Sequence, residues 1–231
     1  EYSSGKLVLQ GFLVQNSSIE GPRPGVLVVH EWWGHNAYAR RRARMLAELG
    51  YTALAVDMYG DGKQASLPED AGKFSKAVMN DVASAKARFL AAKQLLEDHE
   101  TVDATRIAAI GYCFGGGATL ELARSGEGED IAGFATFHGS LDAPEGADYS
   151  ATSAPVLIMH GGADSGIPNS LAAETADMME KAGVTYEVQI YSGAPHAWTV
   201  FGSDRYQELA DKKSWDAFMD FTERYLDGED D

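Results

Sequence analysis

The sequence is poor in cysteine and in basic residues, and both shortages exclude classes of protein. Its 231 residues include one cysteine, Cys113, so no intrachain disulfide, CxxC redox pair or thiolate metal cage can form. Lys and Arg number 19 against 35 Asp and Glu, a formal charge of −16, which disfavours nucleic acid and anionic membrane surfaces. No apolar run approaches the ~20 residues that span a bilayer. We therefore expect no nucleic-acid partner and no membrane partner.

The compartment stays open. The sequence begins at Glu1 without an initiator Met, which indicates that an N-terminal segment was removed. A single cysteine suits the cytoplasm and also permits the periplasm. We expect a soluble protein, cytoplasmic or periplasmic, that is a monomer or a weak homo-oligomer.

The remaining composition is that of a globular protein with alternating element types. The chain is 45% hydrophobic and 23% charged, and its length fits one domain. Short Val-, Leu- and Ile-rich runs alternate with amphipathic segments, a pattern typical of an α/β fold with a mostly parallel central sheet and helices on both faces. We predict one domain over residues 1–231, with the acidic segment 227–231 as a frayed tail.

The individual elements follow from the same alternation. Strands are predicted at Leu7–Val14 (an edge strand), Val26–His30, Thr52–Val56, Arg106–Tyr112, Ala132–His138, Val156–His160 and Tyr186–Tyr191. Helices are predicted at Asn36–Leu49, Asp70–Asp98 (interrupted near its middle), Gly115–Arg124, Asn169–Lys181 and Arg205–Leu226. In such folds the site lies at the carboxyl ends of the strands.

The strongest motif is Gly111-Tyr112-Cys113-Phe114-Gly115-Gly116, between a predicted strand and a predicted helix. It matches the nucleophile-elbow pattern G-x-S-x-G, with cysteine in place of serine. Such a turn holds the nucleophile at the end of the sheet, where the backbone N–H of Phe114 would face a developing oxyanion. The alternative is that Cys113 is a small buried hydrophobe, as many free cysteines are.

Two candidate partners follow in the order that this pattern requires. Asp164 comes directly after the predicted strand Val156–His160, and His196 lies in a Gly-rich loop after Tyr186–Tyr191. His196 would take the thiol proton, and Asp164 would hold the imidazole tautomer. A turn aspartate and a surface-loop histidine are the alternatives, but the agreement of three placements favours a triad with Cys113.

With these motifs, the sequence resembles the dienelactone hydrolase family, a branch of the α/β-hydrolases with a Cys-His-Asp triad. The resemblance covers nearly the whole chain and rests on Leu9–Leu13, Val28–Gly34, Leu54–Gly60, Gly111–Gly116, His138-Gly139, His160–Asp164 with Ile167-Pro168, and Gly193–His196. It implies cleavage of small esters or lactones through a cysteine acyl-enzyme, without a cofactor. It also implies that Glu31 contacts the resting thiol, rather than being a solvated loop acid, and that the Trp32 backbone N–H is the second oxyanion donor.

The residues near these motifs bear on the substrate. The resemblance implies arginines for a substrate carboxylate, yet no Arg lies between His196 and Arg205, and Lys73 is the only basic residue in Ala71–Phe74. Together with the charge of −16, this predicts an uncharged ester or lactone. An aromatic pocket near Cys113 is predicted, with core packing as the alternative for some of its residues. The aromatic candidates are Trp32, Trp33, Tyr59, Phe114 and Trp198.

Functions other than hydrolysis have weaker signals in the sequence. His30, His138 and His160 end predicted strands but lack the spacing of metal ligands, so we expect no metal site. A non-enzymatic or residual-activity protein that keeps the fold for small-molecule binding or stress response stays open. A redox-sensing thiol is weaker, because the chain has no resolving cysteine.

Overall fold

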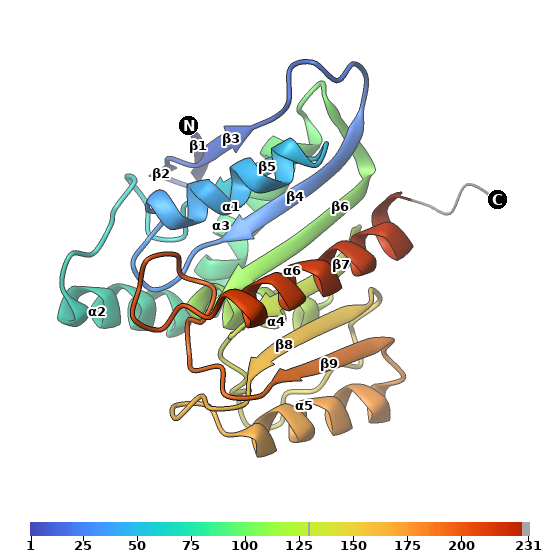
Figure 1. Cartoon of the computed structure of the whole chain (residues 1–231). Coiled ribbons are helices and arrows are strands. Elements are labelled where there is room, and N and C mark those ends of the chain that lie inside the picture. The colour runs from blue at the N-terminus through green and yellow to red at the C-terminus, as the bar shows by residue number, and fades with distance from the viewer. Residues whose placement is uncertain (129, 228–231) are drawn as a thin grey trace. The chain divides into compact units, whose positions relative to one another are not determined.

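The computed structural model describes residues 1–128 and 130–227, which form two compact units, Glu1–Ala109 and Ile110–Asp231. Each unit combines parallel strands with helices (Figure 1). The prediction of one domain over 1–231 stays a prediction. Of the predicted acidic tail only Asp227 is described, and residues 228–231 lie outside the described residues.

The first unit is built on two strands that are buried along their whole length. Its strands are β1 (Tyr2–Ser4), β2 (Leu7–Leu9), β3 (Phe12–Val14), β4 (Arg23–Val29), β5 (Thr52–Val56) and β6 (Val102–Tyr112). Strand β6 runs across the unit boundary. The helices are α1 (Ala37–Glu48), α2 (Pro68–Met79) and α3 (Val82–Glu97). The strand order is β3-β5-β4-β6, with β4 parallel and β3 antiparallel to β5. Helices α1 and α3 both pack on β4 and β5 (Figure 1). Burial of residues 26–29 in β4 and of 53–56 in β5 agrees with the continuous apolar sequence of these segments.

The single strand predicted at Leu7–Val14 is wrong. Strand β2 pairs with β1 in a separate two-stranded sheet, whereas β3 pairs with β5. The chain leaves the strand at Gln10, whose N–H donates to the Asp57 carboxylate at 3.0 Å. At Gly11 a Cβ would lie 2.9 Å from the carbonyl oxygen of Ala55, so the close approach of the two backbones requires glycine.

Capping side chains explain where the helices of this unit begin. The predicted N-cap of α1 is confirmed, because the Asn36 side chain accepts the N–H groups of Tyr38 and Ala39. The predicted interruption within Asp70–Asp98 is confirmed as well, and α3 restarts after Asp81. The Asp81 carboxylate accepts the Ser84 N–H at 3.1 Å.

The second unit carries three parallel strands in the order β7-β8-β9. Its elements are α4 (Phe114–Ser125), β7 (Ile131–Phe137), β8 (Val156–Gly161), α5 (Asn169–Ala182), β9 (Tyr186–Tyr191), α6 (Glu208–Thr222) and a π-helical turn, η1 (Glu223–Asp227). Helices α4 and α6 pack on β7, and α5 packs on β8 and β9 (Figure 1). Helix α6 begins later than predicted from Arg205, because the Gln207 N–H donates to the Trp198 carbonyl oxygen at 3.0 Å and ties this segment to the preceding loop.

None of the helices in the described ranges combines the length and hydropathy that a membrane span needs.

Candidate active site

Cys113 lies in a strained turn between β6 and α4. Its backbone has φ 54° and ψ −117°, a combination that residues with a Cβ rarely adopt. Two hydrogen bonds at 3.1 Å hold it there: the Cys113 N–H donates to the Phe137 carbonyl oxygen, and the Ser140 N–H donates to the Cys113 carbonyl oxygen. The thiol is therefore presented, partly exposed, at the N-terminus of α4. This partial exposure does not fit a fully buried hydrophobe, and the role of Cys113 as a nucleophile stays a prediction.

Two glycines permit this turn because no side chain fits at their positions. A Cβ on Gly111 would lie 2.1 Å from the carbonyl oxygen of Gly115. A Cβ on Gly116 would lie 2.1 Å from Thr136 Oγ1 and 2.5 Å from the Cα of Gly139. The glycines of the motif thus let strand, helix and the loop after β7 meet beside Cys113.

Asp164 and His196 form the pair that their order in the sequence predicts. His196 Nδ1 lies 2.7 Å from Asp164 Oδ2, and the Asp164 side chain is 0% exposed while that of His196 is 25% exposed. Asp164 Oδ1 accepts the N–H groups of Gly166 and Ile167, at 2.9 and 3.1 Å. Because a carboxylate only accepts, the hydrogen bond places the imidazole proton on Nδ1 and leaves Nε2 as the acceptor. The role of His196 as a base stays a prediction.

The loops that carry these two residues touch directly. The Ala163 N–H donates to the Ala194 carbonyl oxygen at 3.0 Å. A Cβ on Gly161 would lie 2.5 Å from that same oxygen, so glycine is required at the end of β8. This contact brings together the ends of β8 and β9, which carry the acid and the histidine.

His138, which belongs to the His138-Gly139 segment of the family resemblance and was not expected to bind a metal, is a neighbour of His196. It is fully buried, has φ 42°, and its Nε2 lies 2.7 Å from Thr199 Oγ1. Its ring packs edge-on against the His196 ring with centroids 5.3 Å apart. The sequence signal was its place at the end of the strand beside the elbow. No group of three metal-ligating side chains occurs within residues 1–128 and 130–227.

The remaining predicted residues at strand ends lie in the first unit. Glu31 is only 5% exposed, which does not fit a solvated loop acid. Tyr59 is buried, and its hydroxyl donates to the Trp32 carbonyl oxygen at 2.8 Å. Trp33 is half-buried, with its ring edge-on to the ring of Trp32 at 5.2 Å.

Trp198, in the second unit, has no exposed surface. Its indole N–H donates to Ser214 Oγ at 3.4 Å, and its ring packs against His138 and Tyr191. The placements of Tyr59 and Trp198 favour the core-packing alternative for these two residues. Their role in a substrate pocket stays a prediction.

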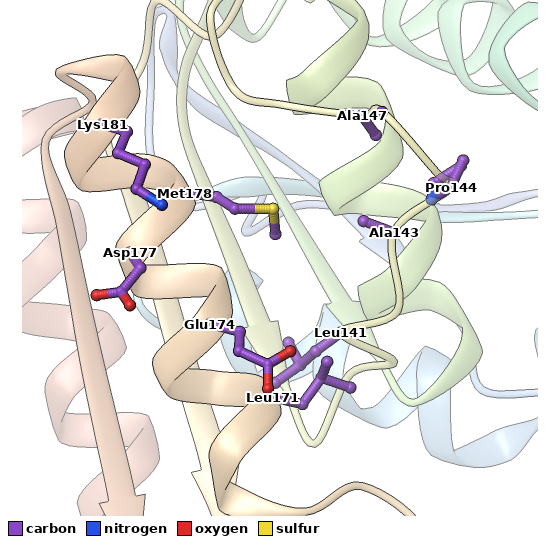
Figure 2. A pocket seen from close by; sticks show the side chains of 10 residues that line it. Leu141, Ala143, Pro144, Ala147, Leu171, Glu174, Asp177, Met178 and Lys181 are labelled. Carbon is purple, nitrogen blue, oxygen red and sulfur yellow. The ribbon is translucent and has the colours of Figure 1, made fainter.

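A cavity of about 410 Å³ lies elsewhere in the second unit. Figure 2 shows it between α5 and the segment after β7, lined by Leu141, Ala143, Pro144, Gly146, Ala147, Leu171, Glu174, Asp177, Met178 and Lys181. None of the three triad candidates lines it, so the cavity does not mark the chemistry.

Comparisons with known proteins cover almost the whole chain. The model of the dienelactone hydrolase family matches residues 9–226. "Protein usf" of Aquifex pyrophilus is 27% identical over 88% of this chain and 89% of its own length. The Bradyrhizobium "Probable 2-oxo-3-(5-oxofuran-2-ylidene)propanoate lactonase" is 29% identical over 91% of this chain and 87% of its own length.

A solved structure gives the same result for the fold. The crystal structure of a dienelactone hydrolase-like promiscuous phosphotriesterase from metagenomic libraries is 31% identical, with a TM-score of 0.88 over 97% of this chain and 96% of that chain. The predicted α/β-hydrolase fold, with a mostly parallel central sheet and helices on both faces, is thus confirmed. The chain belongs to the dienelactone hydrolase family and is a hydrolase that acts on ester bonds.

Proposed function

We propose that this protein cleaves small, uncharged esters or lactones through a cysteine acyl-enzyme. The observation that carries the proposal is the part-buried Asp164–His196 hydrogen bond at 2.7 Å, in the same unit as the strained Cys113 turn. A base fixed in one tautomer and a cysteine at a helix N-terminus are two parts of nucleophilic catalysis.

The reaction has two halves. His196 Nε2 takes the thiol proton, and the Cys113 sulfur attacks the substrate carbonyl carbon, whose oxygen becomes an oxyanion. The backbone N–H groups of Phe114 and Trp32 stabilise that oxyanion. As the tetrahedral intermediate collapses, the alkoxide leaves with the proton from His196, and a thioester remains. Water then loses a proton to His196 and attacks the thioester, and the acid departs while Cys113 regains its proton.

Asp164 and Glu31 have different parts in this proposal. Asp164 stabilises the imidazolium that forms in each half of the reaction. Glu31 keeps the resting thiol protonated, because a carboxylate beside a thiol disfavours the thiolate. This part of the proposal rests on the family resemblance at Glu31, whose 5% exposure differs from that of a solvated loop acid.

The preference for an uncharged substrate rests on charge and on missing arginines. The net charge of −16 repels anions, and the segment Ala197–Asp204 contains no basic residue. The two relatives whose names give a substrate differ in the charge of that substrate. The name of the Bradyrhizobium relative denotes a propanoate, which carries a carboxylate. A phosphotriester, the substrate class in the name of the structural relative, is uncharged.

Mass spectrometry and kinetics on Cys113 variants test the acyl-enzyme. With p-nitrophenyl acetate we expect a burst and an added acetyl mass in the wild type, and loss of both in Cys113→Ala. Undiminished turnover by Cys113→Ala would refute the proposal. Absence of acylation in the wild type with every activated ester, combined with ligand binding, would favour the binding-protein alternative.

Two further comparisons test the substrate charge and Glu31. A lactone that carries a carboxylate is compared with its methyl ester, and we expect the methyl ester to have a kcat/KM at least about tenfold higher. Iodoacetamide, which is neutral, should alkylate Cys113 faster in Glu31→Gln than in the wild type. Equal alkylation rates would count against the proposed part of Glu31.

A further inference from the structure

His30, which directly follows β4, is fully buried and makes hydrogen bonds through both ring nitrogens. Its Nε2 accepts the Met58 N–H at 3.2 Å, and its Nδ1 lies 2.5 Å from the carbonyl oxygen of Glu31. A backbone N–H can only donate and a carbonyl can only accept, so Nε2 is unprotonated and Nδ1 carries the proton. Burial lowers the pKa of His30 from 6.5 to about 4, and the ring is therefore neutral at pH 7.

This bond orients the peptide group that carries the Trp32 N–H. The Glu31 carbonyl and the Trp32 N–H belong to one planar trans peptide, in which C=O and N–H point in opposite directions. No cis peptide occurs among the described residues. With the carbonyl held toward His30 Nδ1, the Trp32 N–H is directed away from His30. The Glu31 carbonyl also accepts the Gly34 N–H at 3.2 Å, which closes the turn.

The next peptide group is held from the other side by Tyr59. Its hydroxyl donates to the Trp32 carbonyl oxygen at 2.8 Å, and its ring packs edge-on against His30 with centroids 4.8 Å apart. Tyr59 is itself fixed at the start of its loop, because Asp57 Oδ1 accepts the N–H groups of Tyr59 and Gly60 at 2.9 and 2.8 Å. Two buried side chains thus fix both peptide groups that flank the Cα of Trp32.

We propose that His30 and Tyr59 are positioning residues that hold the Trp32 N–H in one fixed orientation. The inference rests on the proposed function, which makes that N–H an oxyanion donor. A preorganised donor stabilises the transition state because it does not reorient as charge develops. Neither side chain needs to touch the substrate, and each acts through the backbone. Tyr59, which the sequence predicts as a wall of the substrate pocket, therefore acts through its hydroxyl on the Trp32 carbonyl oxygen.

The test uses an ester and its thionoester, in which sulfur replaces the carbonyl oxygen. Sulfur is a poor hydrogen-bond acceptor, so the rate ratio of the two substrates reports on the oxyanion donors. For Tyr59→Phe we expect kcat/KM for the oxygen ester to fall about tenfold and that for the thionoester by less than about threefold. His30→Asn should change the ratio in the same direction. A purely structural role would lower both rates equally.

The control is Tyr149→Phe, which removes another buried tyrosine hydroxyl, one that accepts from Arg124 Nη1 at 3.1 Å in the second unit. We expect its ratio to equal that of the wild type. If the kcat/KM ratio of the two esters is unchanged in folded Tyr59→Phe, whether both rates stay the same or fall equally, the positioning role is overturned. The acetyl mass on wild-type Cys113 would then still uphold the proposed function. Absence of that acetyl mass would overturn both.

Discussion

Replacing Asp164 by Asn tests the acid of the site with a change of one heavy atom. The Asn Oδ1 can still accept the Gly166 and Ile167 N–H groups, so the turn keeps its hydrogen bonds. Its amide nitrogen replaces the oxygen that lies 2.7 Å from His196 Nδ1. Because the amide donates, Nδ1 must accept and the imidazole proton moves to Nε2. An Nε2 that carries a proton cannot take one from the thiol.

The loss of charge gives the expected magnitude. Charge centres about 4 Å apart at an effective dielectric constant of about 20 interact by about 4 kcal/mol. The fully buried carboxylate would lend the imidazolium this stabilisation. At 1.36 kcal/mol for each factor of ten, kcat/KM should fall about 10³-fold.

Steady-state hydrolysis of p-nitrophenyl acetate measures the effect, with thermal unfolding as the check on the fold. The matched control is Asp211→Asn, the same substitution at a buried acid whose Oδ2 accepts the Tyr206 hydroxyl at 3.3 Å. We expect the control to stay within about threefold of the wild type. An Asp164→Asn enzyme within tenfold of wild-type kcat/KM would refute the reasoning, as would an equal fall in both variants.

The other predictions concern stability, measured by urea denaturation. Gly116→Ala should lower the free energy of unfolding by about 1–3 kcal/mol, since its Cβ would lie 2.1 Å from Thr136 Oγ1. Gly72→Ala in α2, where the nearest atom to a Cβ lies at 4.0 Å, should raise the free energy of unfolding by about 0.5–1 kcal/mol. Equal effects would contradict the packing argument. Asp81→Ala removes the N-cap of α3 and should cost about 1 kcal/mol, and a change below 0.3 kcal/mol would count against the cap. The wild type should lose stability as pH falls from 6.5 towards about 4, by up to about 1.4 kcal/mol per pH unit, because unfolded His30 binds a proton that the buried ring does not. In His30→Asn the free energy of unfolding should depend less on pH over this range. An unchanged dependence would contradict the assignment of this loss to His30.

The sequence by itself determined the features that depend on neighbouring residues. The strands Thr52–Val56 and Tyr186–Tyr191 occur at their predicted bounds. For Thr52–Val56 the reason is that a short apolar run reflects burial of a local segment. Asn36 caps α1 for a similar reason, since a cap bonds to the backbone two and three residues ahead. The order of Cys113, Asp164 and His196 was visible because each follows a strand.

Only the tertiary structure decided which side chains meet. The break of the first predicted strand depends on Asp57, which lies 47 residues from the Gln10 N–H that it accepts. The packing of His138 against His196 likewise joins the ends of different strands. The Trp32 carbonyl oxygen likewise accepts the hydroxyl of Tyr59, which lies 27 residues away. Periodicity shows that a residue is buried but not the partner that it faces, because the partner depends on how distant elements pack.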